Sequence, residues 1–417
     1  MTHSPIQRQR LLDRFLEYVR IDTTANPNAT SYPSSEGQRT LGSLLTEQLR
    51  QMTASEVHQD ENGLVWATIP ATVAAKVPTV ALIAHLDTSP EAPGSSVNPQ
   101  VIDDYRGGDI RLTNGAEITV AQAPELADLI GTTLITTDGR TLLGGDDKAG
   151  IAIIMELAHY LIDYPYLPHG PIRILFTCDE EIGRGTDHID LDKLAADVGY
   201  TLDGGGAGQL DVETFSADGA TVSFHGKNIH PSIGKGRMVN AIRAAAEFVS
   251  RLPHQVCSPE TTCGQQGFVH PYDLSGGVAE AKLKVILRSF ESGDLVAYAS
   301  LLRGIADEVT AWMPGLRVNV DVYRQYRNLA EGLRQQPLSI ELADAAFKNL
   351  GRSCERTRVR GGTDGSQLTE KGLPTPNLSS GQHNIHSPLE FACLDEMVAA
   401  TEHLVELLTL WQDRGRS

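Results

Sequence analysis

The sequence predicts an α/β protein with a mostly parallel sheet, interrupted by a smaller inserted α+β domain. In the first half of the chain apolar strands alternate with helices, as in the strand Thr79–Ala84, the helix 151–161 and the strand Ile172–Thr177. These strands run into acidic or histidine residues and Gly-containing loops, and sites in open α/β sheets form at such carboxyl ends. Between residues 211 and 325 the pattern changes to short alternating strands around two helical patterns.

The helices of the larger domain are predicted from apolar residues that recur every three or four positions. This spacing is found over residues 11–19 and 41–52, and again in a final amphipathic segment, Leu394–Leu408. A further helix is expected near residues 338–350. Residues 88–133 carry many Gly, Pro and Asp residues, so we expect loops and hairpins there.

A chain of 417 residues is long for one domain, and two domains are expected. We predict that residues 1–211 form the first part of the larger domain, residues 212–325 the insertion, and residues 326–417 the second part of the larger domain. The last segment is expected to return to the larger domain because His386 would otherwise lie far from the other polar strand ends.

Composition and charge exclude several classes of protein. The net charge of −18 argues against a nucleic-acid partner and against an anionic membrane surface. The sequence has no apolar run of about 20 residues that could span a bilayer, and residues 1–10 lack the apolar run of a signal peptide. The five cysteines are scattered without a CxxC motif, which is typical of a reducing compartment. We therefore expect a cytoplasmic protein.

Two short motifs place histidine and carboxylate side chains beside predicted elements. His85 and Asp87 follow an apolar strand, and residues two apart on an extended segment point the same way, so a carboxylate can orient a metal-binding imidazole. Asp146 and Asp147 precede a helix in a Gly-rich turn. A single aspartate there is ordinarily a helix N-cap, but both cannot be caps, which favours a metal ligand. A second HxD motif, which ends at Asp190, is interpreted as a helix cap.

Three further groups complete a candidate metal site. Asp179, Glu180 and Glu181 follow an apolar strand; such a run is usually a solvated face, but three like charges repel one another unless a cation is present. One can then be a ligand while a neighbour acts as general base toward a bound water. Asp203 can equally start a turn, and His386 can be a surface histidine. Taken together, these histidine and carboxylate side chains suit zinc without any thiolate.

Long stretches of the chain match a known family. They are HLDTSPEAPG, TTDGRTLLGGDDKAGIA, FTCDEEIGRG, TLDGGGAG, HGKNIHPSIGKGRMVNA, RGGTDGS and KGLPTPNLSSG. From about Phe15 to its end the chain resembles the M20 family of co-catalytic zinc peptidases, and within it the tripeptide aminopeptidases. The resemblance implies a zinc-peptidase catalytic domain, an inserted ferredoxin-like domain that serves as lid and dimerisation surface, and two Zn2+ per subunit.

The resemblance also implies roles for individual residues. Asp146 would bridge the two zinc ions, and the other metal ligands would be His85, Glu181, Asp203 and His386. The catalytic residues would be Asp87, which lies behind a zinc-bound histidine, and Glu180, the general base that takes a proton from the zinc-bound water.

His230, in the inserted domain, would polarise the scissile carbonyl. Arg288 and Arg360 would bind the carboxylate of the peptide. The resemblance further implies a cis peptide bond between Asp146 and Asp147. The chain departs from the family pattern at several positions, which are Cys178, Pro231–Gly234, Ser289 and Ser379–Ser380. Cys178, which replaces a proline, adds a soft ligand near the predicted site.

The predicted function is therefore a zinc-dependent aminopeptidase that releases the N-terminal residue from tripeptides. Its partners would be small peptides and, through the inserted domain, a second copy of the chain. An M20-type dipeptidase or N-acyl amino acid deacylase is an alternative, because these enzymes share the metal ligands. A non-catalytic peptide-binding homologue is an alternative of another class, although the presence of both Asp87 and Glu180 argues against it.

Overall fold

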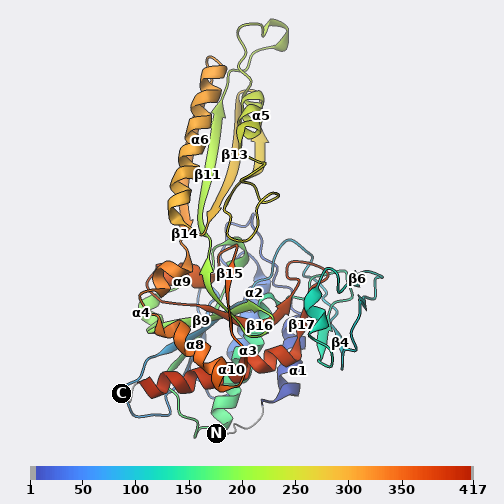
Figure 1. Ribbon diagram of the computed structural model, residues 1–417, viewed down its shortest axis with the longest axis vertical. Coiled ribbons are helices and arrows are strands. Elements are labelled where there is room, and N and C mark those ends of the chain that lie inside the picture. The colour runs from blue at the N-terminus through green and yellow to red at the C-terminus, as the bar shows by residue number, and fades with distance from the viewer. Residues whose placement is uncertain (1–5, 415–417) are drawn as a thin grey trace. The chain divides into compact units, whose positions relative to one another are not determined.

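The computed structural model describes residues 6–414, which divide into two compact units (Figure 1). The larger unit is formed by Met1–Val212, Gly332–Thr357 and Thr363–Ser417, and the smaller by Glu213–Glu331 and Arg358–Gly362. The smaller unit thus continues past residue 325, where we placed its end. Asn328 holds this continuation in the smaller unit, because its side chain accepts the N–H of Thr214 and donates to the carbonyl of Phe290.

An 11-stranded sheet lies at the centre of the larger unit, with the strand order β1-β2-β8-β3-β9-β16-β17-β7-β4 and with β10 and β15 attached to β16. Its strands are β1 (Ser55–Gln59), β2 (Val65–Ile69), β3 (Val80–His85), β4 (Gln100–Ile102), β7 (Leu134–Thr136), β8 (Ile172–Thr177), β9 (Val198–Gly205), β10 (Gln209–Thr214), β15 (Glu355–Val359), β16 (Asn377–His383) and β17 (Phe391–Cys393). The middle of the sheet is the predicted parallel core, since β3 runs parallel to β8 and β9, and β9 parallel to β16. Antiparallel strands extend it on both sides.

Burial explains why the central strands have no polar face. All six residues of β3 are buried, and β8 has one half-buried residue. Strands covered on both faces read as continuous apolar runs, which is how these two were recognised in the sequence. The sequence suggested that Asp203 lies in a loop after the strand. β9 continues to Gly205, however, so Asp203 lies inside the strand.

Helices cover this sheet. They are α1 (Arg8–Tyr18), α2 (Glu36–Gln51), α3 (Gly145–Asp163), α4 (Leu191–Leu194), α8 (Leu338–Asn349), α9 (Asp364–Glu370) and α10 (Leu394–Arg414), with short 3-10 turns at η1 (Pro124–Ala127) and η2 (Glu180–Ile182). α3 packs on β3, β9 and β16 and is covered in turn by α1 and α10, so nearly all its residues are buried. Asp190 caps α4 as predicted, because its carboxylate accepts the N–H of Lys193.

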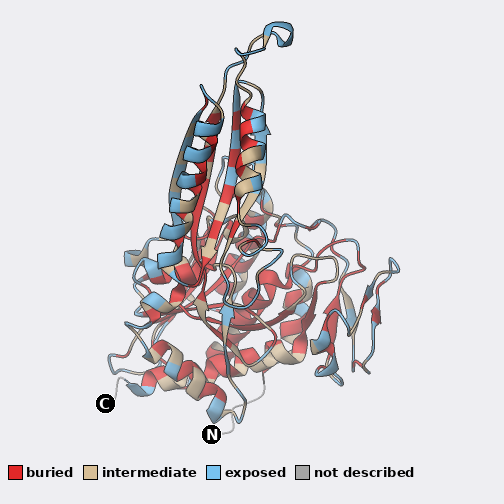
Figure 2. Ribbon diagram, turned by 45° about the horizontal axis from the view of Figure 1, so that its top comes forward, coloured by how far each residue is buried: buried red, intermediate tan, exposed pale blue. Residues whose placement is uncertain are grey.

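The smaller unit has the chain order β11 (Ser216–His225), α5 (Ala241–Arg251), β12 (Phe268–Gly276), β13 (Glu280–Ser289), α6 (Ser292–Trp312) and β14 (Arg317–Tyr326). Its sheet is antiparallel, with the order β12-β13-β11-β14. This βαββαβ arrangement is the ferredoxin-like topology expected for the insertion. Figure 2 shows buried and exposed residues alternating around α5 and α6, whose buried sides form one core with the sheet.

The region between β3 and α3 is a lobe of loops and short strands, as predicted. It contains the two-stranded sheet β5 (Ile110–Arg111) and β6 (Glu117–Ile118) and has its own apolar cluster around Leu126. Within residues 6–414, no helix combines the length and the apolar character needed to cross a membrane.

Candidate functional site

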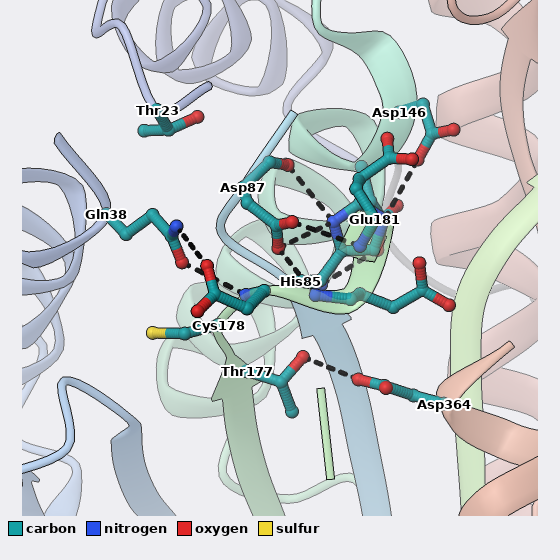
Figure 3. A network of polar contacts seen from close by, with 12 residues as sticks. Thr23, Gln38, His85, Asp87, Asp146, Thr177, Cys178, Glu181 and Asp364 are labelled. Atoms are coloured by element: carbon teal, nitrogen blue, oxygen red, sulfur yellow. Dashed lines mark hydrogen bonds and ion pairs between the residues drawn. The ribbon is translucent and has the colours of Figure 1, made fainter. Parts of the chain in front are cut away.

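Histidine and carboxylate side chains meet at the carboxyl ends of the parallel strands (Figure 3). His85 is the last residue of β3, and β8 ends beside it, since His85 pairs with Thr177. Asp179, in the left-handed region with φ 61°, turns the chain after β8 into the 3-10 turn η2 that carries Glu180 and Glu181. Because β8 has ended there, both glutamates can turn toward the same site.

Asp146 is the centre of this cluster. Its Oδ1 lies 2.9 Å from Nε2 of His85, and its Oδ2 lies 3.2 Å from Nε2 of His386. The same nitrogen of His386 lies 3.0 Å from Oε2 of Glu181, and Nε2 of His85 lies 3.8 Å from Oδ1 of Asp203. The structure therefore brings together all five residues that were predicted to bind metal.

Asp87 lies directly behind His85. Its backbone carbonyl is 3.0 Å from Nδ1 of His85, and its buried carboxylate accepts the backbone N–H groups of Glu180 and Glu181, both at 3.0 Å. One carboxylate thus faces the imidazole and fixes the turn that carries both glutamates. Asp203 is held from the other side, where Nε2 of Gln382 donates to its Oδ1 at 3.0 Å.

The carboxylate of Asp147 bonds to backbone N–H groups and not to an imidazole. Its Oδ2 accepts the backbone N–H of His85 and its Oδ1 accepts the N–H of Gly150, each at 3.2 Å. One oxygen of Asp147 also lies within 4.8 Å of potential ligand atoms of His85 and Asp203, but both its oxygens already accept backbone N–H groups. The peptide bond between Asp146 and Asp147 is cis, as the resemblance implied.

The pKa values of the cluster show that its buried carboxylates are not fully balanced by positive charge. Burial and the charge of Asp146 raise the pKa of Glu181 to about 8 and that of Asp203 to about 6. Burial opposes the charged form of His386, yet Asp146 and Glu181 raise its pKa to about 11. For Asp146, burial alone would raise the pKa, but hydrogen bonds from His386 and His85 hold it below its usual range.

These residues fit a divalent metal ion by their chemistry. Two neighbouring groups, His85 with Asp146 and Glu181, and His85 with Asp147 and Asp203, each present three potential ligand atoms within 4.8 Å of one another. Oε1 of Glu181 is buried without a hydrogen-bond partner among the described residues, so it has an acceptor available for a cation. Imidazole nitrogen and carboxylate oxygen suit zinc, and no thiolate belongs to either group.

Cys178 does not add a ligand to this cluster. A side chain at Gly63 would place its Cβ 3.4 Å from the sulfur, which shows that the thiol packs against the β1–β2 turn. Burial raises the pKa of the Cys178 thiol well above its usual value. The thiol therefore belongs to the core of the larger unit.

The three predicted substrate contacts all lie in the smaller unit. His230 is exposed before the turn η3 (Pro231–Ile233), with Nδ1 2.7 Å from the hydroxyl of Ser232. Arg360 donates to the carbonyls of Gly264 and Gln266 and stacks on two phenylalanine rings. Arg288 donates to the Gln325 side chain and to two backbone carbonyls. Both guanidinium groups are therefore engaged within their own unit.

Sequence reasoning missed several polar residues around the cluster. Asp364, at the start of α9, is buried and accepts the hydroxyl of Thr177 at 2.7 Å. Asp179 was named in the sequence as one of three carboxylates of the candidate site, but its contact with the loop before α2 was not foreseen: it accepts both the backbone N–H and the hydroxyl of Ser34. Glu390 is buried against the Asp146 turn. The available signal was a lone charged residue beside an apolar or Gly-rich run, as in Pro388-Leu389-Glu390-Phe391.

Comparisons with known proteins agree with this geometry. The model of the family described as Peptidase family M20/M25/M40 matches residues 136–410. A protein named Peptidase T from Geobacillus thermodenitrificans is 43% identical over 409 residues, which cover 98% of this chain and 99% of that protein.

Solved structures share the fold. A tripeptidase from Staphylococcus aureus superposes with a TM-score of 0.76 at 24% identity, over 98% of this chain and 100% of that chain. A Bacillus subtilis protein described as a dinuclear metal binding peptidase from the M20 family superposes with a TM-score of 0.64 at 15% identity, over 97% of this chain and 98% of that chain. These likenesses establish the α/β architecture over both units.

Proposed function

Because the chain belongs to peptidase family M20/M25/M40, we propose that it is a metal-dependent aminopeptidase that releases the N-terminal residue from tripeptides. One observation carries the metal dependence. The two oxygens of Asp146 face different histidines, at 2.9 Å from His85 and 3.2 Å from His386. A carboxylate placed in this way can serve two cations at once, as the bridging ligand of a two-metal site.

The remaining ligands divide between the two histidines. His85 and Asp203 would hold one ion with Asp146, and His386 and Glu181 would hold the other. Imidazole nitrogen combined with carboxylate oxygen is a donor set that suits zinc. When bound, two zinc ions supply Lewis-acid activation of a water molecule and of the peptide carbonyl.

Glu180 is the proposed general base. Glu180 begins the 3-10 turn η2 beside Glu181, and its backbone N–H donates to the carboxylate of Asp87. Burial and nearby carboxylates raise the pKa of Glu180 well above its usual value. A carboxylate with a raised pKa takes a proton from the attacking water and returns it to the leaving amine more effectively than an ordinary one. Asp87 would act by positioning both Glu180 and His85. Its carboxylate holds the backbone of Glu180, and its backbone carbonyl holds the imidazole of His85.

The smaller unit would supply recognition of the peptide. His230 is the proposed donor to the oxyanion that forms as the carbonyl is attacked. Arg288 and Arg360 are proposed to bind the carboxylate of the substrate, and each would exchange some of its present bonds to backbone carbonyls for that contact. Arginine side chains that bind the C-terminal carboxylate of the substrate would fix its distance from the scissile bond, and this would favour tripeptides.

We further propose that the enzyme acts in the cytoplasm and pairs with a second copy. All five cysteines are free, which suits a reducing compartment. Sedimentation of the purified chain would test the homodimer.

A substrate panel with controlled metal content tests the function. We expect release of leucine from a Leu-Gly-Gly tripeptide, slower release from a leucine-containing hexapeptide and dipeptide, and no hydrolysis of N-acetyl-leucine. Chelation should abolish the activity and added zinc should restore it. Equal rates on the tripeptide and the hexapeptide would refute the length preference, and hydrolysis of N-acetyl-leucine would identify a deacylase. Lack of any hydrolysis by the zinc-loaded protein would identify a non-catalytic homologue.

A further inference from the structure

Glu390 is a buried carboxylate whose hydrogen bonds all go to one turn of the backbone. It is 1% exposed and lies between β16 and β17. Its Oε2 accepts the N–H of Leu143 at 2.7 Å and of Gly144 at 2.9 Å, and its Oε1 accepts the N–H of Asp146 at 3.2 Å. Three backbone donors therefore converge on a single side chain at the turn that carries the central carboxylate of the site.

The glycines of this turn are explained by the same contact. Gly144 has a φ of 81°, in the left-handed region that favours glycine. A Cβ on Gly145 would lie 3.1 Å from Oε1 of Glu390, closer than side-chain carbons normally approach. A side chain at Gly144 would strain the backbone, and one at Gly145 would press on the carboxylate.

Glu390 also joins two parts of the site that are far apart in the sequence. It lies four residues after His386, and the loop between them is closed by a hydrogen bond from the N–H of Glu390 to the carbonyl of Ser387. His386 in turn faces Oδ2 of Asp146 at 3.2 Å. Through Glu390, the backbone of Asp146 and the loop of His386 form one hydrogen-bonded unit.

We propose that Glu390 is a positioning residue that fixes Asp146 relative to His386 and thereby sets the metal affinity of the site. This inference rests on the proposed two-metal centre. A carboxylate suits the task because both its oxygens are acceptors, whereas a glutamine has one acceptor oxygen and a donor NH2 group. In Glu390→Gln, either the N–H groups of Leu143 and Gly144 or that of Asp146 would face another donor.

Metal affinity is the direct test. Partners that orient metal ligands typically contribute about 10- to 100-fold in affinity, so Glu390→Gln should bind zinc about 10- to 100-fold more weakly in competition with a chromophoric chelator. Glu156→Gln is the matched control. Glu156 is equally buried, on α3, but its partners within residues 6–414 are Arg10 and Arg14. Both variants should lower the thermal stability of the metal-free protein, and only Glu390→Gln should weaken zinc binding.

A second variant covers the case in which Glu390→Gln does not fold. Gly145→Ala leaves every donor and acceptor in place but pushes a methyl group against Oε1 of Glu390. It should weaken zinc binding in the same direction and by a smaller factor. If both variants act through the same contact, their double variant should bind zinc about as weakly as Glu390→Gln alone.

The outcomes separate the inference from the proposed function. If the wild-type chain binds no zinc, the proposed metal centre is wrong and the inference falls with it. If the wild type binds zinc and hydrolyses the tripeptide while Glu390→Gln and Gly145→Ala bind zinc as tightly as the wild type, only the role of Glu390 is refuted. Equal weakening of zinc binding by Glu156→Gln would also refute it, because the effect would then be one of general stability.

Discussion

Neighbouring carboxylates in this chain have different partners and therefore different tasks. The two oxygens of Asp147 accept backbone N–H groups from His85 and Gly150, whereas those of Asp146 face two imidazoles. Asp147 thus performs the helix-capping role that the sequence offered for either aspartate, and this leaves Asp146 for a cation. Composition alone gives no means of assigning the two roles, because the choice depends on which way each side chain leaves the turn.

A parallel division is expected between Glu180 and Glu181. Glu180→Gln should reduce turnover by about 100- to 10,000-fold, the usual contribution of a general base, and should leave the zinc content unchanged. Glu181→Gln should instead reduce zinc content, because Oε2 of Glu181 faces His386 and its Oε1 has no other partner among the described residues. Steady-state kinetics on a tripeptide and metal analysis of the same preparations measure both quantities.

Each variant serves as the control for the other. Near-normal activity of Glu180→Gln, or its purification without zinc, would contradict the role of Glu180. Full zinc content in Glu181→Gln would remove that residue from the ligands.

At the scale of elements, the apolar central strands and the long helices could be predicted, and the polar strands could not. β3, β8 and the middle of α3 are covered on nearly all sides, so their sequences are mostly apolar. β16, with the sequence NLSSGQH, has no such pattern although six of its seven residues are buried. Its side chains form hydrogen bonds with neighbouring strands, as Ser380 does with the carbonyl of Gly204 and Asn377 with the carboxylate of Asp211.

The candidate site follows the same division. His85 and the Asp179–Glu181 run could be found because they end recognisable apolar strands. Glu390 and Asp364 act through contacts with distant segments, at Leu143–Asp146 and at Thr177. No spacing within the sequence records those contacts. The roles of such residues can be recognised only from the folded structure, in which the carboxyl ends of the parallel strands lie side by side.

The packing of α8 against α10 predicts a dependence of stability on pH. His403 on α10 stacks on Phe347 of α8 and bonds through Nε2 to the carbonyl of Ala343. Burial lowers the pKa of His403 to about 4, from an ordinary value of 6.5. As the pH falls below 6.5, His403 binds a proton in the unfolded chain but stays neutral in the folded protein. The stability contributed by neutral His403 is therefore present at neutral pH and is lost toward acid. Between about pH 7 and pH 5 the loss is about 2 kcal/mol.

Denaturant unfolding of the metal-free protein at the two pH values measures this loss. His403→Gln, which cannot titrate, should lose about 2 kcal/mol less than the wild type over this range. His188→Gln, a change at an exposed histidine of the same unit, should behave as the wild type. Parallel losses in the wild type and His403→Gln would show that His403 does not become charged on unfolding.

At the scale of the whole molecule, the chain separates the proposed chemistry from the proposed recognition. The predicted metal ligands and Glu180 belong to the larger unit, and His230, Arg288 and Arg360 belong to the smaller one. The order of elements in the insertion was predictable from its alternating strands, although β12 was not, because it carries Pro271 and a register shift. Asn328, just after residue 325, bonds to the smaller unit through its side chain, a contact that no pattern in the sequence records.

This separation predicts that His230 affects turnover without affecting metal binding. If His230 donates to the oxyanion, His230→Ala should lower kcat by about 100- to 1000-fold, the usual effect of removing one such donor. Zinc content should be unchanged, since no predicted ligand lies in the smaller unit. His254→Ala, at an exposed histidine of the same unit, should retain wild-type kinetics. Wild-type turnover by His230→Ala with both zinc ions present would refute the oxyanion role, and the stabilising charge would then have to come from the larger unit alone.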